Sequence, residues 1–319
     1  MTRRTLIVIC AAALLACSAI ALRPRPHAAQ RLALQQAVSI GQTQVDVKLP
    51  LEKKSVRFAV IGDNGTGESA EYEVAAQMEA YRKVVGYDFV TMMGDNIYGG
   101  HKPRDFELKF ETPYKPLLDA GVKFYACLGN HDDSNETRYK PFNMDGQRYY
   151  SFKKGDAQFF VLDSNYMDAA QLEWINNQLS GSTAKWKIAY FHHPLYSDGR
   201  FHGPDLDLRK QLMPMFEKYG LNVVLSGHDH VYERFKPEEG IYFFLVGNSG
   251  QLRYRNLRQG SGIMAAGFDT DCTFMLVEIS ADRLYYQTIS RTGQTVDSGF
   301  LQRQPKPQAA TTQAVGQTR

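Results

Sequence analysis

The fold is decided by a pattern that first occurs in the stretch VRFAVIGDNG, residues 56–65. Its first six residues are largely apolar and predict a short buried strand, which Gly62-Asp63 ends with a turn. Later stretches repeat this form, in which a short apolar strand stops at Gly, Asp, Asn, Ser or His. These further strands are predicted over residues 89–93, 122–128, 159–162, 186–190 and 222–225.

Helical spacing of apolar residues between these strands predicts helices over residues 71–85, 169–179 and 208–219. Strands that alternate with helices imply an α/β fold with a mostly parallel sheet. Such sheets bind ligands beyond the carboxyl ends of their strands. We therefore expect polar residues from distant segments of the chain to converge at that edge. They are Asp63, Asp95, Asn130, His192, His228 and His230.

A cluster of this composition predicts a metal site. Carboxylates and imidazoles crowded into one cleft repel one another or lose solvation, and a divalent or trivalent cation offsets both costs. Oxygen and imidazole nitrogen without thiolate favour iron, manganese or zinc over calcium or a structural zinc. Asp95 is the natural bridge between two metals, because a carboxylate has two oxygens. Two metals about 3.5 Å apart are typical of phosphoester chemistry.

The full set of strand-end motifs resembles the five-block signature of the calcineurin-like metallophosphoesterases. The blocks are Gly62-Asp63, Gly94-Asp95-Asn96-Ile97-Tyr98, Gly129-Asn130-His131-Asp132, His192-His193-Pro194 and Gly227-His228-Asp229-His230. Within that superfamily, Tyr98 resembles the iron-ligating tyrosine of the purple (tartrate-resistant) acid phosphatases, which lies three residues after the bridging aspartate. The resemblance implies a four-layer α-β-β-α sandwich in which two mixed sheets are flanked by helices.

The resemblance also implies a role for each matching residue. Fe(III) would be held by Asp63, Asp95, Tyr98 and His230, and a second divalent metal (Fe, Zn or Mn) by Asp95, Asn130, His192 and His228. His192 is expected to bind rather than His193, because the family's ligand lies two residues before the proline. As catalytic residues, His131 would orient the phosphate or protonate the leaving oxygen, and His202 would face the substrate. The implied reaction is hydrolysis of phosphomonoesters by a metal-bound hydroxide.

Two other functions stay open on the sequence alone. A phosphodiesterase acting on cyclic nucleotides or phospholipids would use the same metal core, and a non-catalytic surface binding module would keep the fold. Three further polar residues are either supports of the ligands or ordinary surface and turn residues: Asn96, Asp132 and Arg234. His101 is predicted to be an exposed loop residue. The stretch at residues 247–250 is predicted to be a tight turn.

Composition narrows the class of protein. In 319 residues, 43% hydrophobic and 22% charged residues are typical of a globular chain and argue against a disordered or polytopic membrane protein. The net charge of +3 falls to about +1 without Arg3 and Arg4, so nothing indicates a nucleic-acid partner. The expected partner is a small phosphoester substrate. Cys127 and Cys272 are expected to be buried free thiols rather than a disulfide.

The two ends of the chain differ in composition from its middle. Arg3-Arg4 followed by an apolar run to residue 22 predicts an export leader over residues 1–23, which is cleaved, lipidated at Cys17 or retained as a membrane anchor. The protein is then periplasmic, secreted or membrane-anchored. Residues 24–54 are predicted to be a tether with an edge strand near residues 45–49, residues 55–301 the catalytic domain, and residues 302–319 a disordered tail.

Overall fold

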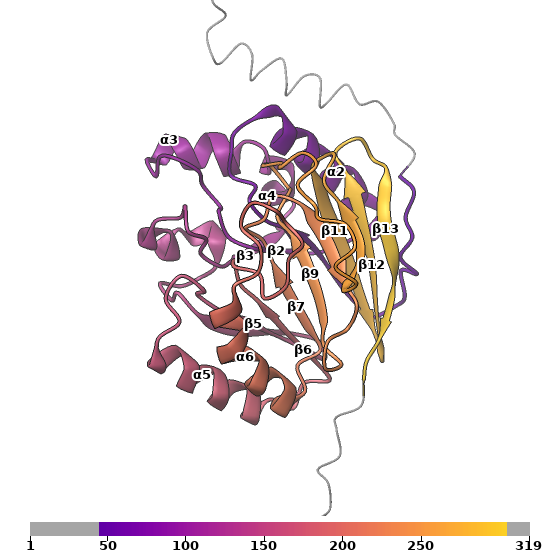
Figure 1. Ribbon diagram of the computed structural model, residues 1–319. Helices are drawn as coiled ribbons and strands as arrows, with labels where there is room; N and C mark the ends of the chain where they lie inside the picture. The colour runs from indigo at the N-terminus through magenta and orange to yellow at the C-terminus, as the bar shows by residue number, and fades with distance from the viewer. Residues whose placement is uncertain (1–44, 305–319) are drawn as a thin grey trace, which may run out of the picture.

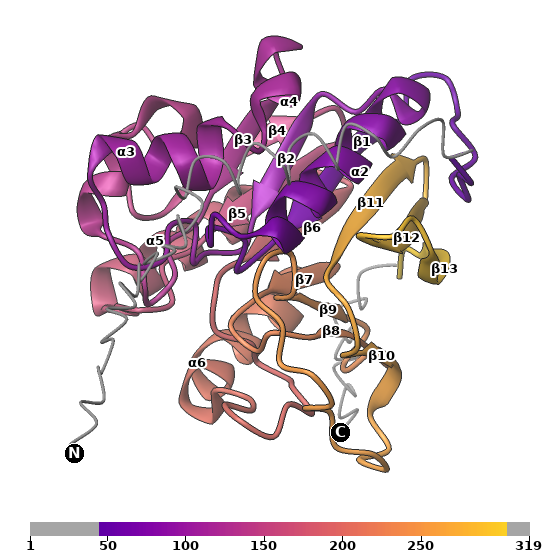
Figure 2. The ribbon, with the colours of Figure 1, turned by 90° about the horizontal axis from the view of Figure 1, so that it is seen from above.

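The computed structural model describes residues 45–304, which form two packed sheets with helices on both outer faces (Figure 1). Seen from above, α2 (Ser69–Val85) and α4 (Lys115–Asp119) lie on one side of the sheets and α6 (Leu206–Tyr219) on the other (Figure 2). This arrangement confirms the four-layer sandwich expected from the sequence. No helix within the described residues is long and apolar enough to cross a membrane.

The first sheet has six strands in the order β13-β12-β11-β1-β2-β3. Its strands are β1 (Val56–Ile61), β2 (Phe89–Met92), β3 (Lys123–Ala126), β11 (Thr273–Ser280), β12 (Arg283–Ser290) and β13 (Thr295–Gln302). Strands β1, β2 and β3 are parallel to one another, whereas β11, β12 and β13 are antiparallel to their neighbours. The parallel half is therefore where neighbouring strands end at the same edge.

The second sheet has seven strands in the order β10-β8-β9-β7-β6-β5-β4. Its strands are β4 (Tyr150–Lys154), β5 (Ala157–Val161), β6 (Trp186–Tyr190), β7 (Val223–Ser226), β8 (Tyr232–Phe235), β9 (Tyr242–Val246) and β10 (Met264–Phe268). Strands β5, β6, β7 and β9 are parallel. β4 and β8 run antiparallel to them on either side, and β10 pairs antiparallel with β8 at the edge of the sheet.

Side chains that point alternately to the two faces of each strand form three apolar layers. In β1, Phe58 and Val60 face the second sheet, whereas Ala59 and Ile61 face α2. Helices α5 (Ala169–Gly181) and α6 cover the outer face of the second sheet (Figure 1), and the side chains on that face are buried beneath them. The remaining short helices are α3 (Pro103–Phe106), η1 (Glu107–Glu111), η2 (Ser134–Arg138) and η3 (Lys140–Phe142).

Local sequence signals explain where the main helices begin and end. Asp168 and Asp205 cap α5 and α6 by accepting hydrogen bonds from backbone N–H groups of the first turn. Gly86 ends α2 in the left-handed conformation that glycine adopts most easily, at a φ of 70°. The helices predicted over residues 71–85, 169–179 and 208–219 are confirmed, each within two residues at either end.

The edge strand predicted near residues 45–49 is wrong. Val45 and Val47 do pack against the core, but their segment forms no strand. Its backbone is satisfied by side chains of β11 and β12 instead, because the Lys48 N–H donates to Gln287 Oε1 at 2.8 Å and the Leu51 N–H to Glu278 Oε2 at 2.8 Å. The leader and most of the predicted tether and tail lie outside the described residues. Cys127 and Cys272 are buried free thiols, as expected.

Candidate metal centre

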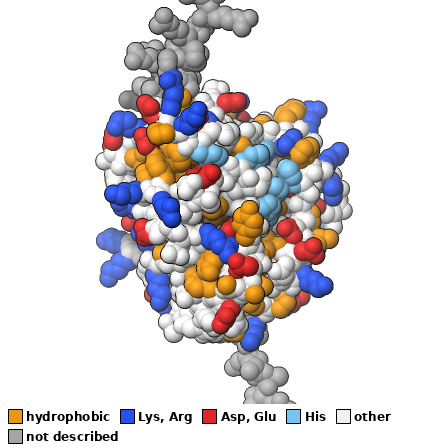
Figure 3. Space-filling model, turned by 90° about the vertical axis from the view of Figure 1, so that its left-hand side faces the viewer, with side chains coloured by type: hydrophobic (Ala, Val, Ile, Leu, Met, Phe, Trp, Pro, Cys, Tyr) orange, Lys and Arg blue, Asp and Glu red, His pale blue; other side chains and the backbone are white. Residues whose placement is uncertain are grey.

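The predicted ligands do converge, at the carboxyl ends of β1, β2, β3, β6 and β7. On the surface, histidine side chains gather on one face of the molecule (Figure 3). Three of the ligand-bearing turns contain non-glycine residues with positive φ: Asp63 at 54°, Asp95 at 52° and His228 at 74°. Such backbone is disfavoured for ordinary residues and is retained mainly where function requires it.

Glycine lets two of these turns come together. A Cβ on Gly129 would lie 2.2 Å from both the backbone nitrogen and Oδ1 of Asp95. Any side chain at this position would push the turn after β3 away from the turn after β2. The glycine of the Gly-Asn-His block is therefore needed for the close approach of Asp95 and His131, whose backbone N–H donates to Asp95 Oδ1 at 2.9 Å.

One group of donor atoms surrounds the Tyr98 hydroxyl. That oxygen lies 3.2 Å from Asp63 Oδ1, 2.9 Å from Asp95 Oδ2 and 3.3 Å from His230 Nε2. His230 Nε2 is in turn 3.4 Å from Asp63 Oδ1. The carboxylates of Asp63 and Asp95 and the imidazole of His230 also satisfy the geometric requirement for a shared metal ion.

A second group surrounds Nε2 of His192, which is fully buried. This nitrogen lies 3.0 Å from Asn130 Oδ1, 3.1 Å from His228 Nδ1 and 3.4 Å from Asp95 Oδ1. The other ring nitrogen of His192 faces the Met93 carbonyl at 2.8 Å. Because Nδ1 donates to that carbonyl, a neutral His192 directs a lone pair from Nε2 toward three other electron-rich atoms.

Both groups fit a metal ion. Atoms bound at 2.0–2.2 Å to one metal lie about 3 Å apart when they meet at right angles, which matches the observed spacings. Asp95 presents Oδ2 to the first group and Oδ1 to the second, and it is the residue that joins them. Without a cation, the lone pair of His192 Nε2 would face the oxygens of Asn130 and Asp95 in a largely buried space, and such an arrangement is costly.

The electrostatics lead to the same conclusion. Burial raises the pKa of the Asp63 carboxyl well above its ordinary value, and burial together with Asp63 and Asp95 raises the pKa of the Tyr98 hydroxyl. Burial and nearby positive charge, Arg253 above all, lower the pKa of His230 to about 4. The protein alone therefore disfavours charge on these groups, whereas a metal cation would favour the carboxylates, the tyrosinate and the neutral imidazole.

The two predicted substrate-facing histidines lie at the rim of this centre. His131 is exposed, and its ring centroid is 4.9 Å from that of Tyr98. His202 is also exposed, and its ring centroid is 4.1 Å from that of His228. The His193 ring packs against that of His228, with centroids 4.5 Å apart, but its Nδ1 is engaged by Ser164 Oγ at 2.9 Å. The geometry thus brings His192, and not His193, among the donors.

Two aspartates hold the loops of the centre: Asp132, which the sequence left open as a possible support and which is partly buried, and the buried Asp229, which sequence reasoning did not assign. Asp132 accepts hydrogen bonds from the backbone N–H groups of Asn96, Ile97 and Gly129. Asp229 accepts from the backbone N–H groups of His202 and Gly203. Both lie inside the quoted motifs, next to predicted ligands, and their spacing to backbone donors only appears once the loops are folded.

The other residues left open by the sequence have ordinary partners. Asn96 lies beneath the centre and donates from its side chain to Asp132 Oδ2 at 2.8 Å. Arg234 pairs with Asp297 at 2.8 Å, away from the donor groups. His101 is half-buried rather than exposed, and its Nε2 lies 3.1 Å from Glu136 Oε1. Ser249 lies in a bend after β9 rather than in a hydrogen-bonded tight turn. It is bonded to Gly62, because its N–H donates to the Gly62 carbonyl at 3.1 Å and its Oγ accepts from the Gly62 N–H at 3.2 Å.

Comparison with known proteins extends this picture. Purple acid phosphatase 17 of Arabidopsis thaliana is 29% identical over 257 residues, which cover 68% of this chain and 75% of the relative. Human tartrate-resistant acid phosphatase type 5 is 26% identical over 302 residues, covering 79% of this chain and 93% of the relative.

Two solved structures share the fold at 19% identity. The purple acid phosphatase PPD1 from yellow lupin seeds superposes with a TM-score of 0.66, covering 80% of this chain and 55% of that one. GAP50, described as the anchor in the inner membrane complex of Plasmodium, superposes with a TM-score of 0.67, covering 79% and 90%. At this identity the likeness concerns the fold alone.

The family model described as calcineurin-like phosphoesterase matches residues 56–232, which is more than half of the chain and includes every proposed ligand. The chain therefore belongs to the calcineurin-like phosphoesterase family, has purple acid phosphatases among its relatives, and is a phosphoric ester hydrolase.

Proposed function

We propose that this protein is an exported phosphatase that hydrolyses phosphomonoesters at a centre of two metal ions. The observation that carries the proposal is the division of one carboxylate between two donor groups. Asp95 Oδ2 faces Tyr98, and Asp95 Oδ1 faces His192. Relatives named acid phosphatases support the reaction class.

The ligand sets follow from the two groups of atoms. Asp63, Asp95, Tyr98 and His230 would hold Fe(III), for which a tyrosinate is a suitable ligand, and Asp95, Asn130, His192 and His228 would hold a divalent Fe, Zn or Mn. When bound, two such ions polarise a phosphoryl group and supply a strong nucleophile at neutral pH. Both the number of metal ions and their identity are thus part of what we propose.

The chain's own residues orient and protonate the substrate. His131 and His202 stand at the rim of the centre, where each imidazole can donate a hydrogen bond to a phosphoryl oxygen. His131 is assigned the proton that the leaving oxygen takes up, because the backbone bond from its N–H to Asp95 fixes its position beside the donor groups. His192 is oriented by the Met93 carbonyl, so its Nε2 stays directed inward.

We propose the same domain division that the sequence predicts. Residues 1–23 act as an export leader, cleaved, lipidated at Cys17 or retained, and residues 55–301 form the catalytic domain. Export accords with the layout of the leader, in which two arginines precede an apolar run.

Hydrolysis of p-nitrophenyl phosphate and of bis-p-nitrophenyl phosphate by the purified protein tests the activity and separates a monoesterase from a diesterase. We expect chelator-sensitive turnover that favours the monoester. Metal analysis should find two ions per chain, and Asp95→Ala should retain fewer than one, while the exposed control Asp88→Ala keeps both. A folded, metal-loaded protein that turns over neither ester would contradict the proposal.

A further inference from the structure

A buried carboxyl group lies behind the turn that carries Asp63. It belongs to Glu71, the third residue of α2, whose side chain is fully buried. Glu71 Oε2 accepts a hydrogen bond from the Gly67 N–H at 2.7 Å and lies 3.5 Å from Thr66 Oγ1. Gly67 is the last residue of the Asp63 segment, which we define as residues 63–67. Glu71 therefore ties the start of α2 to the segment that carries a proposed metal ligand.

The Asp63 segment also contacts the turn that carries Tyr98. The Gly65 carbonyl accepts a hydrogen bond from the Tyr98 N–H at 2.8 Å. A Cβ on Gly65 would lie 1.8 Å from the Asn96 carbonyl oxygen, so the two backbones are packed directly against each other. A displacement of the Asp63 segment would consequently move two members of the first donor group, the carboxylate of Asp63 and the hydroxyl of Tyr98.

Other loops hold the opposite end of this segment. The Gln251 N–H donates to the Asp63 carbonyl at 2.9 Å, and the Ser249 N–H donates to the Gly62 carbonyl at 3.1 Å. Asp63 itself has a positive φ of 54°, a conformation that persists only where the surroundings fix it. The segment is thus held at its start by these loops and at its end by Glu71.

Burying a carboxyl group at this place is costly. Burial raises the pKa of both the Glu71 carboxyl and the Tyr114 hydroxyl well above their ordinary values, and the nearby amide of Asn64 opposes the rise in each. Among residues 45–304, Glu71 Oε1, the Tyr114 hydroxyl and both polar side-chain atoms of Asn64 have no hydrogen-bond partner. Unsatisfied buried polar atoms lower stability, and residues that carry such a cost are often retained for function.

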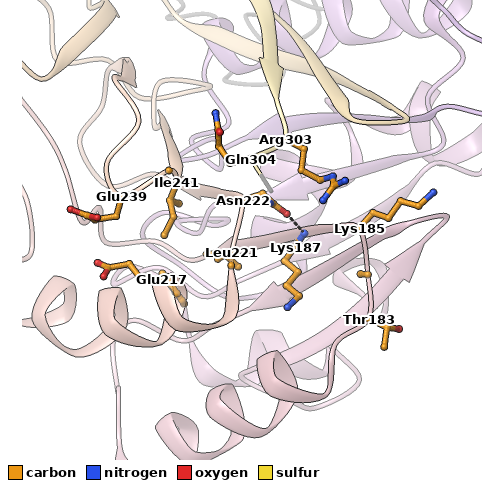
Figure 4. A pocket seen from close by; sticks show the side chains of 14 residues that line it. Thr183, Lys185, Lys187, Glu217, Leu221, Asn222, Glu239, Ile241, Arg303 and Gln304 are labelled. Carbon is orange, nitrogen blue, oxygen red and sulfur yellow. Dashed lines mark hydrogen bonds between the residues drawn. The ribbon is translucent and has the colours of Figure 1, made fainter. Parts of the chain in front are cut away.

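Another buried charged residue shows the contrast. Lys187 lies at the amino end of β6, in a pocket far from the ligand-bearing turns (Figure 4). Its Nζ donates to the Tyr219 carbonyl at 2.7 Å and to the Leu179 carbonyl at 3.4 Å, which lie at the carboxyl ends of α6 and α5. Such capping of two helices is a sufficient structural reason for a buried ammonium group. Glu71 instead binds the segment of a proposed ligand.

We propose that Glu71 is a positioning residue for the iron side of the centre, where it fixes Asp63 and Tyr98 through the Asp63 segment. This inference rests on the proposed function, which assigns Fe(III) to the first donor group. The hydrogen bonds of Glu71 described above go to the Asp63 segment, whereas the second donor group belongs mainly to the turns after β3, β6 and β7. Glu71 should therefore affect the first metal more than the second.

Metal binding to the full chain tests this role without turnover. Glu71→Ala should lower the affinity of the first site for Fe(III) about tenfold or more, because partners behind metal ligands typically contribute this much. It should also shift the tyrosinate-to-iron absorption, while Zn(II) binding at the second site changes far less. Glu71→Gln should restore both the iron affinity and the absorption, since its amide oxygen can accept from the Gly67 N–H.

Val74→Ala is the matched control. Val74 is a fully buried side chain of the same helix that packs in the apolar core. Its truncation should lower the Tm, as Glu71→Ala does, but leave the iron affinity and the absorption spectrum unchanged. Equal changes of the iron affinity in Glu71→Ala and Val74→Ala would show that iron binding follows stability alone, and would overturn the positioning role. Wild-type iron affinity in Glu71→Ala would overturn it as well.

Failure of the proposed function would look different. If the wild-type chain binds a metal at the first site without tyrosinate absorption, or hydrolyses no phosphoester, the assignment of the iron or of the activity is wrong. A first-site affinity that falls in Glu71→Ala and returns in Glu71→Gln would still uphold the role of Glu71 in that case.

Discussion

Replacing Asp132 with asparagine should loosen two ligand-bearing turns at once. The carboxylate accepts four hydrogen bonds: Oδ1 from the backbone N–H groups of Asn96 at 2.7 Å and Ile97 at 3.1 Å, and Oδ2 from the Gly129 N–H and the Asn96 side chain, both at 2.8 Å. An asparagine has only one oxygen, so its amide nitrogen must face two donors. Two of the four bonds are therefore lost in either orientation.

The magnitude follows from which donors are left. In the less costly orientation the amide nitrogen faces the Gly129 N–H, which loses its acceptor, and the Asn96 side chain, which keeps its bond to the Cys127 carbonyl at 2.8 Å. One unsatisfied buried N–H costs about 1–3 kcal/mol and one lost hydrogen bond about 1 kcal/mol, so we expect a loss of about 2–4 kcal/mol. For a domain of this size that corresponds to a fall in Tm of roughly 5–15 °C.

Thermal unfolding followed by circular dichroism in the presence of a chelator measures this loss without a contribution from bound metal. The neighbouring Asp133→Asn is the matched control. Asp133 caps η2 by accepting from the Asn135 N–H at 2.8 Å, and an asparagine oxygen can do the same. If the Tm of Asp132→Asn stays within about 2 °C of that of Asp133→Asn, the view of Asp132 as the residue that ties the turns together is refuted.

Three further predictions address single groups of the centre and its surroundings. Tyr98→Phe should remove any visible tyrosinate-to-iron absorption of the iron-loaded protein while the circular dichroism spectrum stays native; an unchanged absorption spectrum would exclude Tyr98 as a ligand. His131→Ala should lower kcat by about 100-fold with metal content unchanged, and a parallel loss of metal, measured by elemental analysis, would show a structural role instead. Burial raises the pKa of Glu233 from 4.5 to about 8, so the folded protein holds a proton there that the unfolded chain releases. Stability should therefore fall as the pH rises from about 4.5 to 8, and urea unfolding should show a smaller fall in Glu233→Gln. An identical pH dependence in both proteins would contradict that assignment.

Much of the fold could be predicted because strand and turn signals coincide. The strands expected at residues 56–61 and 186–190 match β1 and β6, since apolar runs there end at polar turns that also carry the ligands. The strand β4 was missed, because Tyr150–Lys154 mixes aromatic and basic residues and is only partly buried at the edge of its sheet. Alternation did place Val45 and Val47 inward, but it could not show that side chains of β11 and β12 would satisfy their segment in place of a strand.

The metal site could be predicted because its residues are polar and metal-binding, and they stand directly after buried apolar strands. Aspartate, asparagine and histidine after successive strands indicate a metal whatever the details of the loops. The distinction between His192 and His193 could not come from chemistry, since both are imidazoles. It depends on the Met93 carbonyl and the Ser164 hydroxyl, which lie far away in the chain and each engage one of the two rings.

The two anchoring aspartates explain why the motifs contain more acid than the metals need. Asp132 directly follows His131, and Asp229 lies between His228 and His230, yet neither carboxylate faces the donor groups. Asp132 binds the turns after β2 and β3 to each other, and Asp229 binds the loop that carries Phe201 and His202. A carboxylate is suited to this task, because its two oxygens can accept from several backbone N–H groups at once, which a neutral amide cannot do. Through Asp229, the position of the loop that carries His202 depends on the same motif that supplies His228 and His230.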